Sequence, residues 1–220
     1  RNGDFYGRNF DYVFNDTPEF IVHVKANEAK GRHESIGVAT HFGLREAKLL
    51  AGNYDRELEL IPNLTLDGIN DAGLICSHNV VSMEALTDGI IPETNPGAAN
   101  ELHQLFVPRY ILDNANNVDH AIELLTDENL NIKGNLNGKH FLHIMIAGKD
   151  KNGVDKTVIV EFFHKDGSTH NHFDVVNEEK TTDEQIMTNF YRNTISFTNN
   201  EKNGEERFAI LKDGYANATS

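Results

Sequence analysis

The order in which strand-like and helix-like patterns follow one another constrains the fold of this chain more than any other sequence feature. Alternating, β-branched segments come first, then two segments with helical periodicity, then strands again and a last short helix. This order is typical of an α+β layered fold. We predict strands at 4–11, 18–25, 34–42, 74–81, 140–147, 157–164 and 185–189, and helices at 100–115, 118–126 and 205–212.

Glycine and aspartate place the expected turns. Asp67-Gly68 and Asp71-Ala72-Gly73 supply the turn chemistry of a hairpin that leads into the strand at 74–81. A second hairpin turn is expected at 150–153. This segment resembles part of a calcium-binding loop but lacks the terminal bidentate glutamate, so we interpret it as a turn. A third hairpin is expected to close at Asp166-Gly167.

Two residues bear on the predicted helices. Pro108 would strain the helix at 100–115 in its middle or split it, because proline lacks the N–H that an interior helical position uses. Asn117 fits the N-cap of the helix at 118–126. The segment 205–212 contains the start of a helix that the chain hardly completes.

Arg8 and Asp11 stand out on the first predicted strand. They are three residues apart and lie among the aromatic residues Phe5, Tyr6 and Phe10. Charged groups are rarely buried unless they are paired or have a task. An ordinary ion pair at a strand end is one interpretation of the two residues, and a functional site is the other.

Composition narrows the classes of partner. The 220 residues fit one large domain, and a hydrophobic content of 39% allows a real core. A net charge of -14 argues against nucleic acid or an anionic membrane as partner, because both require a basic surface. No apolar run approaches the roughly 20 residues of a membrane span. The sequence leaves the compartment open, with a cytoplasmic location slightly favoured, and it leaves homo-oligomerisation open.

Four further positions could carry chemistry, and each has a simple structural interpretation. Cys76, the only cysteine, would be a small buried hydrophobe, and it follows that no intrachain disulfide can form. Asn79, next to His78, and Asn189 would be strand-end residues that satisfy backbone groups. Arg207 would lie on the surface of a short helix.

The histidines His164, His170 and His172 form a cluster in the sequence. They straddle a predicted hairpin turn, and their spacing matches no template for a metal site. A solvated turn is therefore favoured over a metal site. A metal-binding protein that uses its 11 histidines is a third functional hypothesis, with little support.

Taken together and in order, these positions resemble the choloylglycine hydrolase family, the linear amide hydrolases that include bile salt hydrolases and penicillin V acylases. Five motifs spread over nearly the whole chain carry the resemblance. They are Gly7-Arg8-Asn9-Phe10-Asp11, the stretch Asp67-Gly68-Ile69-Asn70-Asp71-Ala72-Gly73-Leu74, the hairpin Leu142-His143-Ile144-Met145-Ile146 with Val158-Ile159-Val160-Glu161, Thr188-Asn189, and Arg207-Phe208.

The resemblance implies an N-terminal-nucleophile fold, an αββα sandwich of two antiparallel sheets between helical layers. It implies a cysteine nucleophile at the mature amino terminus, whose own α-amine shuttles the proton and which requires no cofactor. Arg8 would favour the thiolate, and Asp11 would hold the α-amine. Asn79 and Asn189 would serve the oxyanion or the polar network of the site. Arg207 would complete it.

The chain departs from the family pattern at two points. The family's cysteine would fall before Arg1, and Cys76 cannot replace it because the mechanism needs the sulfur and the free amine on one residue. The family's second oxyanion asparagine follows Gly-Leu by about six residues, whereas Asn79 follows Leu74 by five.

We therefore expect residues 1–220 to form a single amidase-like domain that lacks the first strand of its fold, and the sequence leaves open whether the domain is also shortened at the carboxyl end. The expected activity is hydrolysis of a linear amide such as a conjugated bile salt, penicillin V or an N-acyl amino acid, with the 220 residues alone inactive. The alternative is a catalytically inactive relative, or a small-molecule binding module, with the same fold.

Overall fold

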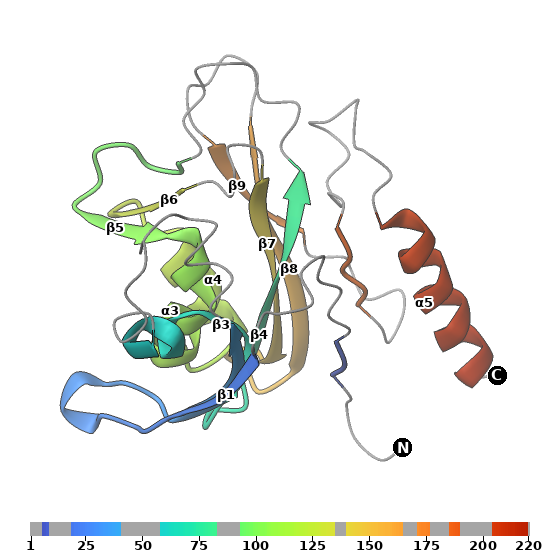
Figure 1. Cartoon of the computed structure of the whole chain (residues 1–220), viewed down its shortest axis with the longest axis horizontal. Coiled ribbons are helices and arrows are strands. Elements are labelled where there is room, and N and C mark those ends of the chain that lie inside the picture. Colours follow the sequence, from blue (N-terminus) through green and yellow to red (C-terminus); the bar gives the residue numbers. More distant parts are fainter. Residues whose placement is uncertain are drawn as a thin grey trace.

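A computed structural model describes residues 6–8, 19–40, 58–82, 93–134, 140–164, 171–176, 185–189 and 204–219. In this part of the chain, a seven-stranded antiparallel sheet carries two helices on one side, and a third helix lies on the other side (Figure 1). Helices combined with an antiparallel sheet confirm the α+β class that the sequence predicts.

The strands of the main sheet lie in the order β1-β2-β3-β4-β7-β8-β9, and each is antiparallel to its neighbours. This order confirms the strands predicted at 18–25, 34–42, 74–81, 140–147 and 157–164 as far as their residues are described. The bounds are β1 Glu19–Val24, β2 Ser35–Thr40, β3 Thr65–Asn70, β4 Ile75–Ser82, β7 His140–Lys149, β8 Asp155–His164 and β9 Asn171–Val176.

The turn at Asp71-Ala72-Gly73 is confirmed, but Asp67-Gly68 is not part of it. Both residues lie inside β3, where Gly68 pairs with Gly37 of β2. A Cβ on Gly68 would come within 2.8 Å of both the Ile36 carbonyl oxygen and Leu112 Cδ1. Glycine is needed here for close packing of strand and helix, which a sequence pattern cannot distinguish from a turn.

The helix predicted at 100–115 is three elements. Residues Asn100–His103 form β5, Gln104–Phe106 form the 3-10 helix η3, and only Val107–Asn114 form the helix α3. Pro108 lies in the first turn of α3, where its missing N–H costs no hydrogen bond. The proline therefore marks the start of the helix rather than a kink in its middle.

Strand β5 gains its partner from a segment distant in the sequence. It pairs in parallel with β6, Leu130–Lys133, from Asn100↔Leu130 to His103↔Lys133. The helical spacing of the apolar residues from 102 to 111 does not predict this pairing. Tertiary contact with β6 favours a strand here over the helix that the spacing predicts. Two further 3-10 helices are Glu28–Lys30 (η1) and Ile61–Asn63 (η2).

Of the two other predicted helices, one has nearly the predicted length and one is longer than predicted. Helix α4, Val118–Leu125, matches its prediction, and the Asn117 side chain caps it by accepting a hydrogen bond from the His120 N–H at 2.9 Å. Helix α5, Glu205–Thr219, is longer than the segment 205–212 predicted for it.

The main core lies between the sheet and α3 and α4. Helix α3 packs on β3 and β4, and α4 packs on β7 and β8. The buried apolar side chains of this core are Leu74, Cys76, Val107, Ile111, Leu112, Ala115, Val118, Ala121, Leu125, Leu130, Ile132, Ile144, Ile146, Val158, Val160 and Phe162. Burying each of the larger ones contributes about 1.5–3 kcal/mol to folding.

The opposite face of the same strands is polar at its centre. Because side chains alternate along a strand, Cys76 toward the helices places Ser77 and Asn79 on the other face. The segments 6–8 and 185–189 and helix α5 lie on this side (Figure 1). The described residues at 6–8 and 185–189 show no strand pairing, so the strands predicted there are not found in them. A second antiparallel sheet stays a prediction.

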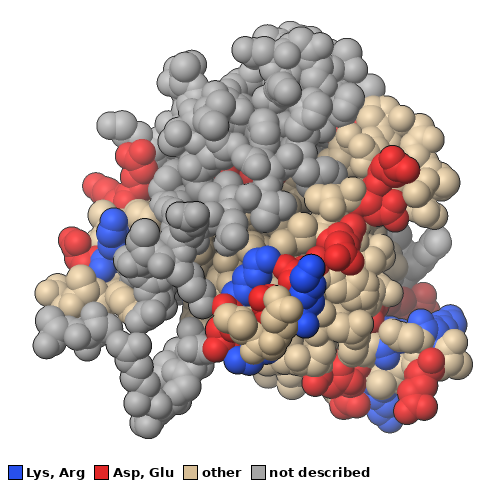
Figure 2. Space-filling model, turned by 180° about the vertical axis from the view of Figure 1, so that it is seen from behind, with Lys and Arg blue, Asp and Glu red and all other residues tan. Residues whose placement is uncertain are grey.

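The surface drawn in Figure 2 carries acidic and basic side chains interspersed. Of the helices that the structure describes, none combines the length and the apolar composition that a membrane span requires.

Candidate functional site

Arg8 joins the amino-terminal segment to the sheet. Its Nη1 donates to the Leu66 carbonyl oxygen at 3.1 Å, and its Nη2 donates to Asn79 Oδ1 at 3.0 Å. Nη1 also lies 3.7 Å from Asp67 Oδ2, and both side chains of this ion pair are mostly buried. The contact with Asn79 spans 71 residues of sequence, and it brings together two of the predicted site residues.

Asn79 continues the contact toward the segment 185–189. Since its Oδ1 accepts from Arg8, its Nδ2 faces the carbonyl oxygens of Met187 and Thr188, at 3.5 and 3.4 Å. These two distances are long for N–H···O bonds, so the amide holds the carbonyl groups loosely. Asn79 therefore lies beside Arg8, although its position differs by one residue from that of the asparagine in the family pattern.

Asn189 and Arg207 complete the cluster. Asn189 Nδ2 donates to the Val80 carbonyl oxygen at 2.9 Å, and Arg207 Nη2 donates to Asn189 Oδ1 at 2.7 Å. Arg207 itself is exposed on α5. Arg8, Asn79, Asn189 and Arg207 thus lie along one run of side-chain and backbone contacts, while Asp11 lies outside the described residues.

Sequence reasoning assigned no role to three buried residues beside this cluster. His143 on β7 and Glu161 on β8 are fully buried, with His143 Nδ1 3.3 Å from Glu161 Oε1. His143 Nε2 lies 2.6 Å from the carbonyl oxygen of Thr188, the third residue. A signal was available, because Glu161 interrupts the apolar run Val158–Phe162, and a charge there needs a partner.

Burial dominates the electrostatics of the site. Desolvation raises the pKa of the Asp67 carboxyl above its usual range, and the Arg8 guanidinium opposes this rise. Desolvation also raises the pKa of the Tyr6 hydroxyl, against a hydrogen bond with Ser77. Arg8 is therefore a cation that stabilises buried negative charge at this end of the sheet.

Cys76 and His78 point away from the site, toward the helices. Cys76 is completely buried, as predicted for a small hydrophobe, and burial raises the pKa of its thiol. Burial lowers the pKa of His78 to about 3, which keeps the imidazole neutral. A neutral thiol on the far side of the sheet is no nucleophile for this site.

The histidine cluster is only partly described, and the 150–153 segment is described in full. His164 and His172 lie on β8 and β9, and His170 lies outside the described residues. Within the described part, no group of three or more potential ligands could hold a metal ion. The segment 150–153 is the predicted turn between β7 and β8, and Asp150 Oδ1 accepts from the N–H groups of Asn152 and Val154.

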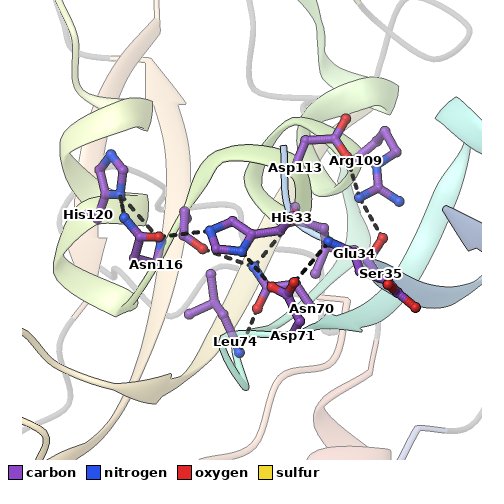
Figure 3. Close-up of polar contacts among 12 residues, drawn as sticks. His33, Glu34, Ser35, Asn70, Asp71, Leu74, Arg109, Asp113, Asn116 and His120 are labelled. Atoms are coloured by element: carbon purple, nitrogen blue, oxygen red, sulfur yellow. Dashed lines mark hydrogen bonds and ion pairs between the residues drawn. The ribbon is translucent and has the colours of Figure 1, made fainter. Parts of the chain in front are cut away.

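A second polar cluster, not predicted, lies at the β2–β3 end of the sheet against the α3–α4 connection (Figure 3). His33 Nδ1 is 2.5 Å from Asp71 Oδ1, and His33 Nε2 is 2.7 Å from Asn116 Oδ1. The hydrogen bond with His33 holds the pKa of Asp71 below its usual range. Asn116 in turn faces His120 Nδ1 at 3.4 Å.

Buried contacts extend this second cluster into the fold (Figure 3). Asn70 Nδ2 donates to the carbonyl oxygens of Leu112 and Ala115, which end α3. Arg109 Nη2 donates to Ser35 Oγ at 2.7 Å, tying α3 to β2. These contacts join β2 and β3 to α3 and to the α3–α4 connection, so this cluster fixes the helices on the sheet.

Comparison with known proteins gives matches among solved structures alone. Neither a protein-family model nor a curated protein matches the sequence significantly. Solved structures that match include two variants of the conjugated bile acid hydrolase from Clostridium perfringens, with TM-scores of 0.42 and 0.44. Each is 19% identical to this chain, over 74% of this chain and 43% of the hydrolase chain. The chain thus spans less than half the length of those structures, and we rest the proposal below on its own residues.

Proposed function

We propose that this chain belongs to an amide hydrolase that cleaves a linear C–N bond between an acyl group and a small amine or amino acid. The observation that supports the proposal is the convergence of Arg8, Asn79, Asn189 and Arg207, which come from separate segments of the sequence, on one face of the sheet. These are the described residues to which the resemblance to choloylglycine hydrolases assigns roles. Their contacts fit those roles.

In the proposed reaction, the nucleophile is a cysteine at the amino terminus of the mature protein, ahead of Arg1. Its thiolate attacks the amide carbonyl carbon, and a C–S bond forms. The C–N bond then breaks, and the leaving amine takes a proton from the α-ammonium group. Water attacks the resulting thioester and gives a proton back to the α-amine. The products are a carboxylic acid and an amine, and the thiolate is restored.

Each site residue has a task in this reaction. Arg8, a cation fixed by Leu66 and Asn79, would favour the thiolate, because a nearby positive charge lowers a thiol pKa. Asp11 would hold the α-amine. Asn189 would stabilise the oxyanion, since its amide has two N–H groups and within the described residues one of them is used on Val80.

Arg207 would position that donor. Its bond to Asn189 Oδ1 at 2.7 Å supports an amide orientation in which Nδ2 is turned toward the sheet. Asn79 would be the second donor, with an amide oriented in the same way by Arg8. Candidate substrates are conjugated bile salts, penicillin V and N-acyl amino acids.

The experiment starts from the mature protein isolated from its native source. Amino-terminal sequencing and intact mass should identify a terminal cysteine. Amine release should be measured with a glycine-conjugated bile salt, penicillin V and an N-acyl amino acid, before and after treatment with iodoacetamide. We expect release from at least one substrate and its loss on alkylation. A polypeptide of residues 1–220 alone should be inactive.

Two results would contradict the proposal. Amidase activity from residues 1–220 alone would remove the terminal cysteine from the mechanism. A mature protein without a terminal cysteine that binds one of these amides and releases no amine would favour the non-catalytic binding module.

A further inference from the structure

Three side chains form a transverse row on the polar face of the sheet. Asn79 and His143 are paired residues of β4 and β7, and the register that pairs Ile144 with Val160 places His143 opposite Glu161 on β8. His143 and Glu161 are completely buried. Buried titratable groups need a task or a partner, and the reaction proposed above uses neither residue.

The hydrogen-bond partners determine the tautomer of His143. A carbonyl oxygen can only accept, so the contact with Thr188 at 2.6 Å requires a proton on Nε2. Nδ1 faces Glu161 Oε1 at 3.3 Å, and one proton between these two atoms satisfies both.

The carbonyl group that His143 binds lies next to Asn189. Side chains contact the segment 185–189, whose described residues show no strand pairing. Thr188 oxygen accepts from His143 at 2.6 Å and from Asn79 at 3.4 Å, and the Thr188 hydroxyl donates to the Gly204 carbonyl oxygen at 3.1 Å. The His143 bond is the shortest of the three.

We propose that His143, held in its Nε2–H form by Glu161, is the positioning residue that fixes the Thr188 carbonyl group and with it the Asn189 amide. The positioning stands on the contacts alone, and only its catalytic consequence rests on the proposed function. The His143–Glu161 pair thereby links the centre of the sheet to the Asn189 amide, the proposed oxyanion donor.

The first test uses the unmodified protein. The ¹⁵N spectrum of the His143 imidazole, assigned with a His143→Gln variant, should show a proton on Nε2 at neutral pH. An unprotonated Nε2 would overturn the proposal without any need for a variant to fold.

The second test compares variants of the mature full-length protein. In His143→Leu/Glu161→Leu the donor to Thr188 is lost, and both members of the buried His143–Glu161 contact are replaced together, so neither is left facing an apolar side chain. Glu161→Gln retains a side chain that can donate to Nδ1 and so keeps the Nε2–H form. Met145→Leu, on the same face of β7, is a volume-conserving control.

Two readouts separate positioning from activity. The side-chain amide signals of Asn189 should move toward free-asparagine positions in the double variant and stay in place in Glu161→Gln and Met145→Leu. With an active enzyme, kcat of the double variant should fall roughly 10- to 100-fold at nearly constant KM. Unmoved Asn189 signals in a folded double variant would overturn the positioning role. Moved signals in an enzyme with no activity would support it and contradict only the proposed function.

Discussion

At the scale of the residue, burial changes the chemistry of His78. Its pKa is lowered to about 3, whereas an unfolded histidine titrates near ~6.5. Between these values the unfolded state binds one more proton than the native state. The free energy of unfolding therefore rises with pH through this window and falls on acidification, by up to about 1.4 kcal/mol per pH unit.

We expect His78→Leu to remove this contribution. Urea unfolding from about pH 4.5 to about pH 6 measures how the free energy of unfolding changes with pH. The slope should be smaller in the variant than in wild type, by an amount that corresponds to up to one bound proton. Val80→Ala, on the same strand and face, should lower stability without changing the slope. Equal slopes for wild type and His78→Leu would mean that native His78 takes up a proton in this range.

The second residue-scale prediction concerns Arg8. In the mature enzyme, Arg8→Ala should raise the pKa of the terminal thiol, at ~1.4 kcal/mol per unit, because it removes the cation that we propose lies beside the thiol. The pH dependence of thiol alkylation measures this, with thermal unfolding measured beside it. Arg32→Ala removes the same charge near the β1–β2 connection and should leave alkylation unchanged.

A purely structural ion pair would behave differently. Loss of Arg8 would then leave Asp67 buried without its cation, and stability would fall by roughly 3–5 kcal/mol. An Arg8→Ala protein that alkylates normally and melts much earlier would show that Arg8 serves the fold alone.

At the scale of the element, Gly204 sets how α5 meets the segment 185–189. Its φ is 98, and a Cβ would lie 2.9 Å from the backbone nitrogen of Asn189. Gly204→Ala should therefore destabilise the protein by at least about 1–2 kcal/mol, from backbone strain and this contact. It should also displace the Asn189 amide and lower activity.

Gly214, within α5, is the matched control for Gly204. A Cβ there meets nothing within 4 Å, so Gly214→Ala should stabilise the protein by about 0.5–1 kcal/mol. Urea unfolding of both variants checks the pair. Equal effects of the two substitutions would show that Gly204 is not under steric constraint.

At the scale of the whole molecule, stability should decrease from the centre of the sheet to its β1 edge. Strand β7 lies between β4 and β8 and has fully buried residues on both faces, such as Ile144 and His143. Strand β1 ends the described sheet and has no fully buried residue, and Ile21 is 80% exposed. Local opening of β1 therefore breaks few contacts.

Native-state hydrogen exchange measures this gradient. Amides of β7 should exchange only through global unfolding, at about 5–15 kcal/mol, whereas amides of β1 that pair with β2 should exchange through local opening at much lower free energy. Protection of β1 equal to that of β7 would contradict the gradient.

Local signals in the sequence were sufficient for several elements. The alternation at 18–25 and 140–147 predicted β1 and β7, and the helical spacing with Asn117 predicted α4. These signals act between residues that are neighbours in the sequence or one helical turn apart, so they can be read without knowing the fold. The family-like motifs also singled out Arg8, Asn79, Asn189 and Arg207.

The tertiary structure alone decided which of these residues meet. The bond between Arg8 and Asn79 spans 71 residues and that between Asn79 and Thr188 spans 109, distances over which no periodicity acts. Asn100–His103 became a strand because Leu130–Lys133 lies beside it, against its own helical spacing. The sequence by itself determined the local elements and the list of polar residues. Packing of distant segments decided that Thr188 lies on His143 and Asn189 beside Arg207, because only folding brings a carbonyl group within reach of a donor so far away along the chain.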